Sequence, residues 1–151
     1  MEKLLIVDDD IGVQKQLKWS LADYEVVLAD TRESAIAAVR RHEPKVVTLD
    51  LGLPPDAANA SEGLAALQQI LEIAPHTKVI VITGNDDRTN ALKAIEMGAY
   101  DFYQKPVDAD VINVIVSRAF SLATIETDNR IMKSIVGCDT GISFQNLSSS
   151  N

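Results

Sequence analysis

Four short runs of strand-forming residues recur along this 151-residue chain, and each one ends beside a residue capable of chemistry. The runs cover residues 4–7, 46–49, 79–82 and 100–104. The first three are almost entirely apolar and do not alternate with polar residues, a pattern typical of strands that helices bury on both faces. The chain is therefore predicted to form a parallel sheet between two layers of helices.

The segments between the runs have the 3.6-residue spacing of amphipathic helices. Asp10 is placed to cap the first helix, and Asp30 with Glu33 has the spacing of a capping box. Gly98 is placed for a left-handed helix end. The apolar residues of the five expected helices are Val13, Leu17 and Leu21; Ala35, Ile36 and Val39; Leu64, Leu67 and Leu71; Leu92 and Ile95; and Ile112, Ile115, Val116 and Ala119. With a second strand at residues 25–29, this α/β alternation predicts a doubly wound, five-stranded parallel sheet with helices on both faces.

The residues that follow the strands are expected to meet, because the carboxyl ends of parallel strands lie at one edge of a sheet. They are Asp8, Asp9, Asp50, Thr83 and Lys105. Three carboxylates at one edge repel one another and raise at least one pKa unless a cation lies between them. Magnesium suits such a site, since it prefers oxygen ligands and bridges to phosphate oxygens. The sequence therefore predicts a magnesium-dependent phosphoryl-transfer site.

Position along the chain suggests a role for each of these residues. Asp50 stands alone at the end of a central strand and is the candidate nucleophile, which would form an aspartyl phosphate. Asp8 and Asp9 form the adjacent acidic pair that a metal site needs. Lys105 would place its charge on one phosphoryl oxygen, and the Thr83 hydroxyl would donate a hydrogen bond to another.

Composition narrows the range of functions. A net charge of −8 argues against nucleic-acid binding by this chain, because nucleic-acid-binding modules usually carry a basic stripe. The sequence contains neither a stretch of about 20 apolar residues nor a secretion signal, which predicts a cytoplasmic protein without a membrane segment. The single cysteine, Cys138, cannot form an internal disulfide and is given no role.

With these residues placed, the chain resembles the receiver domain of bacterial two-component response regulators. That family has an acidic pair after the first strand, a phosphorylated Asp after the third, a Thr or Ser after the fourth and Lys-Pro after the fifth. The matching segments are Leu-Ile-Val-Asp-Asp-Asp, Thr-Leu-Asp-Leu-Gly-Leu-Pro, Val-Ile-Thr-Gly and Asp-Phe-Tyr-Gln-Lys-Pro. The resemblance covers residues 1–122 and implies the flavodoxin-like strand order 2-1-3-4-5.

The resemblance also implies a phosphodonor and a set of metal ligands. Receivers take a phosphoryl group from the histidine of a sensor kinase, or from small phosphodonors, with Mg2+ as cofactor. The acceptor matches Asp50. The metal would be held by Asp9, by Asp50, by the backbone carbonyl of Gly52, and through a water molecule by Asp8.

A conformational switch is a further implication of the resemblance. On phosphorylation the hydroxyl of Thr83 would move toward the phosphate, and the aromatic residue at Phe102 would rotate inward. The product stays attached, so the protein acts as a switch rather than as a turnover enzyme, with slow self-dephosphorylation at most. A homodimer through the fourth helix and fifth strand is also expected, and the Lys105–Pro106 peptide bond is expected to be cis.

The sequence around the phosphorylation site resembles that of receivers of the NtrC-like class. In that class the receiver is followed by an ATPase that acts with sigma-54 polymerase and by a helix-turn-helix. The loop at residues 54–63 is longer than the usual receiver turn. It either gates access to the site and contacts the kinase, or is a tolerated surface insertion, since lengthening a loop costs little free energy.

The end of the chain leaves two possibilities open. Residues 123–136 keep a helical spacing and form a helical extension or a linker, and the small, polar residues 137–151 are expected to be disordered. The chain is either the N-terminal piece of a longer regulator or a receiver that works through protein contacts alone.

Two rival functions remain. A haloacid-dehalogenase-like phosphatase would use Asp8 as nucleophile, with an acid two residues on at Asp10. That family places its lysine before its final acidic pair, an order that Lys105 does not follow, and Asp50 would have no function. The other rival is a degenerate receiver that folds without accepting phosphate, although every position of the receiver site is filled.

Overall fold

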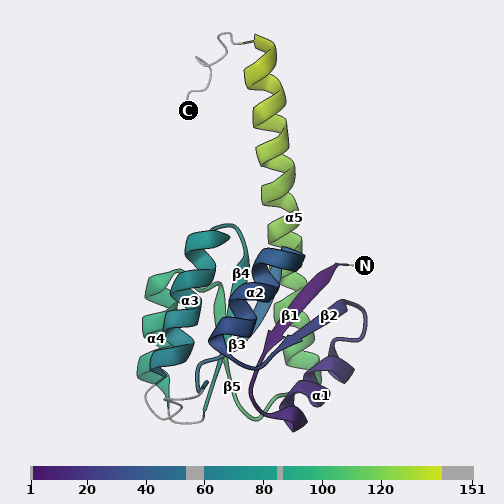
Figure 1. Ribbon diagram of the computed structural model, residues 1–151. Helices are drawn as coiled ribbons and strands as arrows, with labels where there is room; N and C mark the ends of the chain where they lie inside the picture. The colour runs from purple at the N-terminus through teal and green to yellow at the C-terminus, as the bar shows by residue number, and fades with distance from the viewer. Residues whose placement is uncertain (1, 54–59, 85–86, 141–151) are drawn as a thin grey trace.

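The computed structural model describes residues 2–53, 60–84 and 87–140, with side chains as far as residue 129. Strands and helices alternate along the chain (Figure 1). Their bounds are β1 Lys3–Val7, α1 Ile11–Ser20, β2 Glu25–Ala29, α2 Arg32–His42, β3 Val46–Asp50, α3 Ser61–Ile73, β4 Lys78–Thr83, α4 Arg88–Met97, β5 Asp101–Gln104 and α5 Ala109–Thr140. Among the described residues, no helix is long and apolar enough to cross a membrane.

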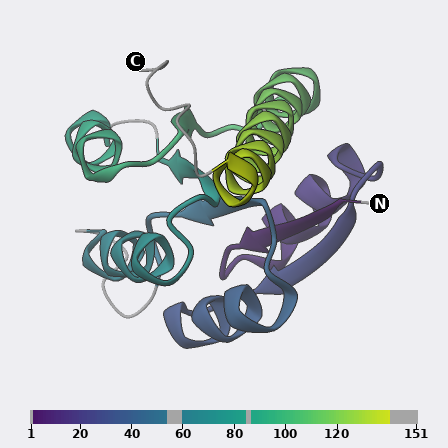
Figure 2. The ribbon, with the colours of Figure 1, turned by 90° about the horizontal axis from the view of Figure 1, so that it is seen from above.

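The five strands form one parallel sheet in the order β2-β1-β3-β4-β5, which confirms the predicted fold and strand order. All residues of β3 are buried, as expected for the central strand of a sheet covered on both faces. Helices α1 and α5 cover one face, and α2, α3 and α4 cover the other (Figure 2). The sheet therefore lies between two hydrophobic cores.

One core lies beneath α1 and α5, where the predicted residues Leu17, Ile112, Val116 and Ala119 are fully buried. The other lies beneath α2, α3 and α4 and is centred on strand residues such as Val47. Burying apolar area of this kind contributes about 25 cal/mol per Å2, which makes the two cores the main stabilising force on the sheet.

Two helices differ in detail from the sequence prediction. The capping box of α2 is formed by Thr31 and Ser34, one residue after the predicted Asp30 and Glu33, because the Thr31 hydroxyl accepts a hydrogen bond from the Ser34 amide at 3.0 Å. Helix α4 buries two alanines rather than the larger Leu92 and Ile95, which are 49% and 37% exposed. Two other predicted caps are confirmed: Asp10 caps α1, and Gly98 ends α4 with a φ of 116°.

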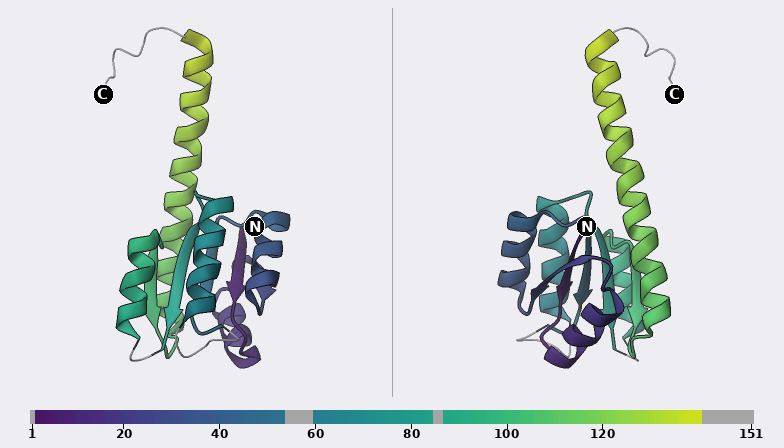
Figure 3. Two further views of the ribbon diagram at one scale, coloured as in Figure 1. Left: turned by 60° about the vertical axis from the view of Figure 1, so that its left-hand side comes forward. Right: turned by 90° about the vertical axis from the view of Figure 1, so that its right-hand side faces the viewer.

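Helix α5 is 32 residues long and projects from the body of the molecule (Figures 1 and 3). Its projecting part lies beyond the amino ends of the strands, opposite the edge where the chemistry-bearing residues were predicted. The helix continues through residues 137–140, which the sequence had placed in a disordered tail, while residues 141–151 lie outside the described part of the chain. Most of the predicted long loop, residues 54–59, also lies outside it.

Candidate functional site

The carboxyl ends of the central strands bring together the acids that the sequence predicted. Asp8 follows β1 and is fully buried, and Asp50 ends β3 with 5% of its surface exposed. Asp9 is exposed beside them. One carboxylate oxygen from each of the three lies within 4.8 Å of the others. The sheet therefore concentrates negative charge at one small place on its edge.

Lys105 supplies the opposing charge. Its Nζ lies 3.4 Å from Asp50 Oδ2 and 3.9 Å from Asp8 Oδ2. Its backbone amide donates to the carbonyl of Thr83 at 2.8 Å, which fixes the end of β5 beside the end of β4. The Lys105–Pro106 peptide bond that follows is cis, as expected. A point charge within reach of both buried acids is the arrangement that an incoming anionic group requires.

Backbone amides orient the two buried carboxylates. The Asp10 amide donates to Asp8 Oδ1 at 2.9 Å, and the Gly52 amide donates to Asp50 Oδ1 at 3.0 Å. The second oxygen of each carboxylate faces Lys105. Within the described residues, Asp8 Oδ2 and the hydroxyl of Thr83 are buried without a hydrogen-bond partner. Buried polar atoms are nearly always paired, so these two atoms mark a place built for a ligand.

Burial and the neighbouring acids affect the ionisation of Asp8. Desolvation, opposed by the hydrogen bond from the Asp10 amide, raises the pKa of Asp8 from 3.8 to about 7, and the negative charges of Asp50 and Asp9 add to the increase. Lys105 acts in the opposite direction. A divalent cation among these oxygens would favour the ionised form of Asp8, since an opposite charge at close range lowers the pKa of an acid.

The donor set fits a hard divalent cation. It consists of three carboxylates, and the buried oxygen Asp8 Oδ2 has no hydrogen-bond partner among the residues that the structure describes. Magnesium is bound in proteins by one or two carboxylates together with water and phosphate oxygens, whereas softer metals favour sulfur or imidazole. The acidic cluster is therefore suited to Mg2+.

Two other predicted residues lie close to this edge. Gly52 follows Asp50 by two residues, so its backbone is part of the same loop. Phe102 is half-buried on β5 and packs against the core beneath α4.

Asp10, which the phosphatase alternative needs as a second acid, caps α1 by accepting hydrogen bonds from the amides of Gly12 and Val13 at 2.8 and 3.3 Å. Asp10 is therefore committed to a structural role.

A glycine that sequence reasoning missed supports the loop after Asp50. Gly63 lies in the first turn of α3, and a Cβ atom there would stand only 2.3 Å from the backbone carbonyl oxygen of Leu51. Only glycine permits so close an approach of helix to backbone. The available signal was an isolated glycine inside a helical pattern, which often has a structural reason.

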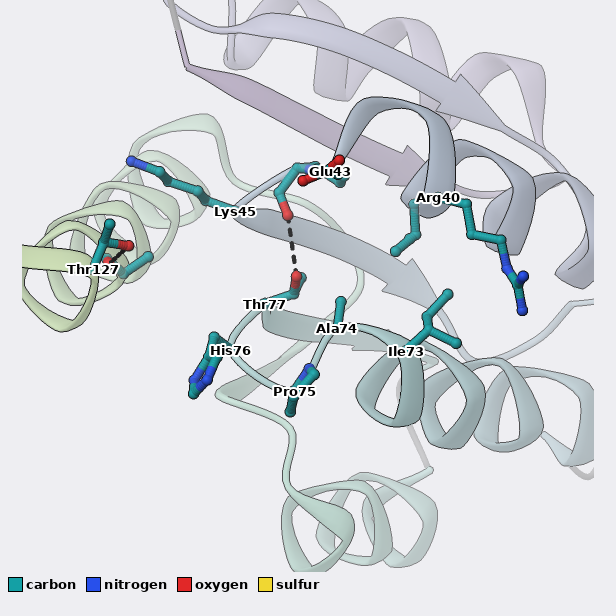
Figure 4. A pocket seen from close by; sticks show the side chains of 12 residues that line it. Arg40, Glu43, Lys45, Ile73, Ala74, Pro75, His76, Thr77 and Thr127 are labelled. Atoms are coloured by element: carbon teal, nitrogen blue, oxygen red, sulfur yellow. Dashed lines mark hydrogen bonds between the residues drawn. The ribbon is translucent and has the colours of Figure 1, made fainter. Parts of the chain in front are cut away.

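A pocket of about 570 Å3 lies at the opposite edge of the sheet (Figure 4). It is lined by the loops that precede β3 and β4, including Lys45 and His76, and by Ala123 and Thr127 of α5. None of the predicted site residues lines it. The candidate site is therefore the acidic cluster and not this cavity.

Comparison with known proteins agrees with the arrangement of the site. The family model of the response regulator receiver domain matches residues 4–117. The chain belongs to the response regulator receiver family. This membership confirms the resemblance that the motifs indicated, and it overturns the haloacid-dehalogenase-like alternative, which the capping role of Asp10 also contradicts.

Individual relatives include regulators of two sizes. The chain is 31% identical over 134 residues to the nitrogen assimilation regulatory protein NtrX of Azorhizobium caulinodans, covering 87% of this chain and 29% of that protein. It is 33% identical over 122 residues to the chemotaxis protein CheY of Listeria monocytogenes, covering 79% of this chain and 98% of that protein. A crystal structure of NtrX from Brucella abortus in complex with ADP matches with a TM-score of 0.81 and 30% identity, over 91% of this chain and 30% of that one.

These matches place the receiver among NtrC-like relatives, as the wording of its motifs had suggested. It is also 30% identical over 132 residues to the regulatory protein AtoC of Escherichia coli, covering 86% of this chain. The chain spans less than a third of the length of NtrX and of AtoC. It spans nearly the whole of CheY.

Proposed function

We propose that this receiver is a phosphorylation switch whose acceptor is Asp50. The observation that carries the proposal is the Asp50 carboxylate itself. It is nearly buried at the end of the central strand, oriented by the Gly52 amide at 3.0 Å, and faced by Lys105 Nζ at 3.4 Å. A carboxylate held in this way can attack phosphorus while a neighbouring cation compensates the charge of the phosphoryl oxygens.

The phosphoryl donor would be a phosphohistidine of a sensor kinase or a small acyl phosphate. An oxygen of Asp50 forms a bond to phosphorus as the bond from phosphorus to the donor's nitrogen or oxygen breaks, and the leaving group departs with that bonding pair. Lys105 Nζ then pairs with one phosphoryl oxygen. The Thr83 hydroxyl, buried and without a partner among the described residues, donates to another.

Magnesium would be held by Asp9, by Asp50 and by the Gly52 carbonyl, with Asp8 binding through a water molecule. The bound ion would neutralise charge on the incoming phosphoryl group. The Asp10 amide holds Asp8 Oδ1 and leaves Oδ2 directed at Lys105, so that the carboxylate is fixed before any ligand arrives.

The response to phosphorylation would involve Thr83 and Phe102. Thr83 ends β4, and Phe102 lies on the adjacent strand β5, where it pairs in register with Val81. Movement of the Thr83 hydroxyl toward the phosphate would leave space that the ring of Phe102 fills by rotating inward. A change there would reach the exposed apolar residues Leu92 and Ile95 of α4. Their exposure supports a homodimer through the α4 and β5 face.

The output would be transcriptional, through a sigma-54-dependent domain outside these 151 residues, in a cytoplasmic protein. The support is the set of NtrC-like relatives, whose own chains are more than three times as long as the matched segment. CheY, which has about the length of a receiver alone, favours a second possibility in which the receiver works through protein contacts.

Intact-mass spectrometry after incubation with acetyl phosphate and Mg2+ tests the proposal. We expect one phosphoryl adduct that requires Mg2+ and is absent from Asp50→Asn. Asp110→Asn, a change of the same kind at an exposed position of α5, serves as the matched control and should label normally. A folded wild-type protein that takes no phosphate, or an adduct that maps to Asp8, would overturn the assignment.

A further inference from the structure

Helix α3 begins directly on the loop that follows Asp50, yet its own start is weakly stabilised. Its N-cap residue, Ala60, has a left-handed backbone with a φ of 60° and provides no side-chain cap. Side-chain caps typically add about 1 kcal/mol to a helix, and a left-handed alanine is itself unfavourable. Something other than local capping must therefore hold the first turn of α3 in place.

Arg32 of α2 makes that connection. Its Nε donates to Glu62 Oε2 at 2.9 Å, and its Nη1 donates to Gln69 Oε1 at 2.8 Å. The Arg32 and Glu62 side chains are only 30% and 19% exposed, so solvent screens their pairing less than that of a surface ion pair. The guanidinium thus binds α3 at two points, one in the first turn of the helix and one about two turns later.

The position of Arg32 within its own helix argues that this contact matters. Arg32 is the first residue of α2, where the positive end of the helix dipole disfavours a cation. Local helix chemistry favours an acid at this point. Pairing with Glu33 of α2 at 3.6 Å offsets part of that penalty, and the two contacts with α3 add to this compensation.

The first turn of α3 in turn lies against Leu51, which belongs to the acceptor loop, residues 51–53 directly after Asp50. Gly63, next to Glu62, approaches Leu51 so closely that a Cβ would stand 2.4 Å from the Leu51 Cα. The other side of the loop is held by the Leu51 amide, which donates to the Ile82 carbonyl of β4 at 3.0 Å. One residue further on, the Gly52 amide orients Asp50.

We propose that Arg32 is a positioning residue for phosphoryl transfer: by holding Glu62, it presses the first turn of α3 onto the acceptor loop and so fixes the Gly52 backbone beside Asp50. The inference rests on the proposed function. It extends that function to a residue 18 positions before the acceptor, on a helix that contributes no group to the acidic cluster. Breaking the contact should loosen both the amide that orients Asp50 and the carbonyl proposed to bind Mg2+.

The test compares the two contacts that the Arg32 guanidinium makes with α3. Arg32→Met removes both, together with the 3.6 Å pairing to the exposed Glu33, while keeping most of the side-chain volume. Glu62→Met removes only the contact with the first turn, and Gln69→Met removes only the later one. Mg2+ affinity is measured by calorimetric titration without a phosphodonor, labelling by acetyl phosphate is followed by mass spectrometry, and stability is measured by thermal unfolding.

We expect Arg32→Met and Glu62→Met to weaken Mg2+ binding and to slow labelling by about tenfold each, as loss of an outer-shell contact typically does. The double variant should lose no more than either single variant, because both changes interrupt one line of contacts. Gln69→Met should destabilise the fold but leave Mg2+ affinity and labelling within about twofold of the wild type, since it spares the first turn.

The proposal would be overturned if Arg32→Met bound Mg2+ as tightly as the wild type and lost stability as Gln69→Met does. Arg32 would then make only an ordinary contact between helices. If Arg32→Met fails to fold, Glu62→Gln, which removes only a charge, should show the same loss in weaker form. Because Mg2+ affinity is measured without a phosphodonor, a wild type that binds Mg2+ but never labels would contradict the proposed function and leave the positioning result intact.

Discussion

The two edges of the sheet differ in how their polar groups are paired. At the amino edge, Lys78 pairs with Glu126 of α5 at 2.7 Å, and the Thr77 hydroxyl donates to the Pro44 carbonyl at 3.1 Å. At the carboxyl edge, Asp8 Oδ2 and the Thr83 hydroxyl are buried without a hydrogen bond from any described residue. Strand β4 joins the two edges, because it begins at Lys78 and ends at Thr83.

This difference separates stability from function. A paired group at the amino edge holds α5 against the sheet. An unpaired buried oxygen at the carboxyl edge costs about 1–3 kcal/mol, which the folded protein must offset elsewhere. Proteins accept such penalties where the unpaired atoms meet a ligand. Replacing one of these unpaired groups, or binding a ligand to them, should therefore stabilise the folded protein. Replacing a paired group at the amino edge should destabilise it.

The largest expected effect is a fall in the stability of the metal-free protein as the pH rises. The pKa of Asp8 is 3.8 in the unfolded chain and about 7 in the folded protein, so the folded protein keeps this proton to a higher pH. Between these values the folded state binds more protons, so the free energy of unfolding falls with rising pH, by on the order of 4 kcal/mol in total. Below the lower value both states are protonated, and Asp8 contributes no pH dependence.

Urea unfolding of the wild type and of Asp8→Asn at about pH 5 and about pH 8 measures this effect. The difference between the two proteins isolates Asp8 from other titrating groups. Asp8→Asn should be the more stable protein at the higher pH and should lose most of its advantage at the lower one. Parallel pH profiles would show that Asp8 carries no penalty and would remove the contrast between the edges.

The second effect is stabilisation by Mg2+ near pH 8. At ten times its dissociation constant, an ion that binds only the folded state adds about 1.4 kcal/mol to the free energy of unfolding. Thermal unfolding with MgCl2, and with NaCl at matched ionic strength, distinguishes binding from screening. Asp9→Asn should lose the effect and Asp110→Asn should keep it. Equal stabilisation by the two salts would contradict a metal site.

Much of this edge was predictable from the sequence because strand ends are a local signal. A run of apolar residues that stops at Asp8 or Asp50 indicates both a buried strand and its end, and parallel topology then brings the ends together. The family motifs added the strand order. Neither prediction depends on how a helix packs against the sheet.

Helix contacts were less predictable because they depend on distant partners. In α4, Leu92 and Ile95 are the most apolar residues, yet the alanines beside them face the sheet, since small side chains allow a closer approach. The partners of Arg32 lie 30 and 37 residues away in sequence, where no local pattern connects them. The cap of α2 shifted by one residue because Thr31 and Asp30 are both good caps and tertiary placement selects between them.

A third prediction separates a functional unpaired hydroxyl from a merely buried one. Thr48 in the middle of β3 and Thr83 at the end of β4 both have a buried hydroxyl without a partner in the described part of the chain. Replacing either with valine should raise the free energy of unfolding by about 1 kcal/mol. Only Thr83→Val should slow labelling by acetyl phosphate, by about tenfold, because a hydrogen bond to a charged oxygen contributes about 1.5–3 kcal/mol.

Urea unfolding and a labelling time course on the two variants test that prediction, and each variant serves as the control for the other. Slower labelling in Thr48→Val would mean that the hydroxyls of the sheet interior act together. A loss of stability in both variants would mean that the hydroxyls are paired in solution.

The smallest expected effect lies at the amino edge. The side chains of Lys78 and Glu126 are 16% and 35% exposed, so their pairing is partly screened by water. A double-mutant cycle with Lys78→Met and Glu126→Gln should give a coupling energy of about 0.5–1 kcal/mol. Both variants should be less stable than the wild type, in contrast to Asp8→Asn.

Labelling by acetyl phosphate then decides how independent the two edges are. Lys78 begins the strand that Thr83 ends, so β4 connects the contact with α5 to the Thr83 side of the candidate site. If the strand is a rigid spacer, breaking the Lys78–Glu126 pair leaves the labelling rate unchanged while α5 loosens. If the rate changes by more than about twofold, and Lys45→Met, which breaks the neighbouring Lys45–Glu2 pair, leaves it unchanged, then β4 transmits the state of α5 to the acceptor.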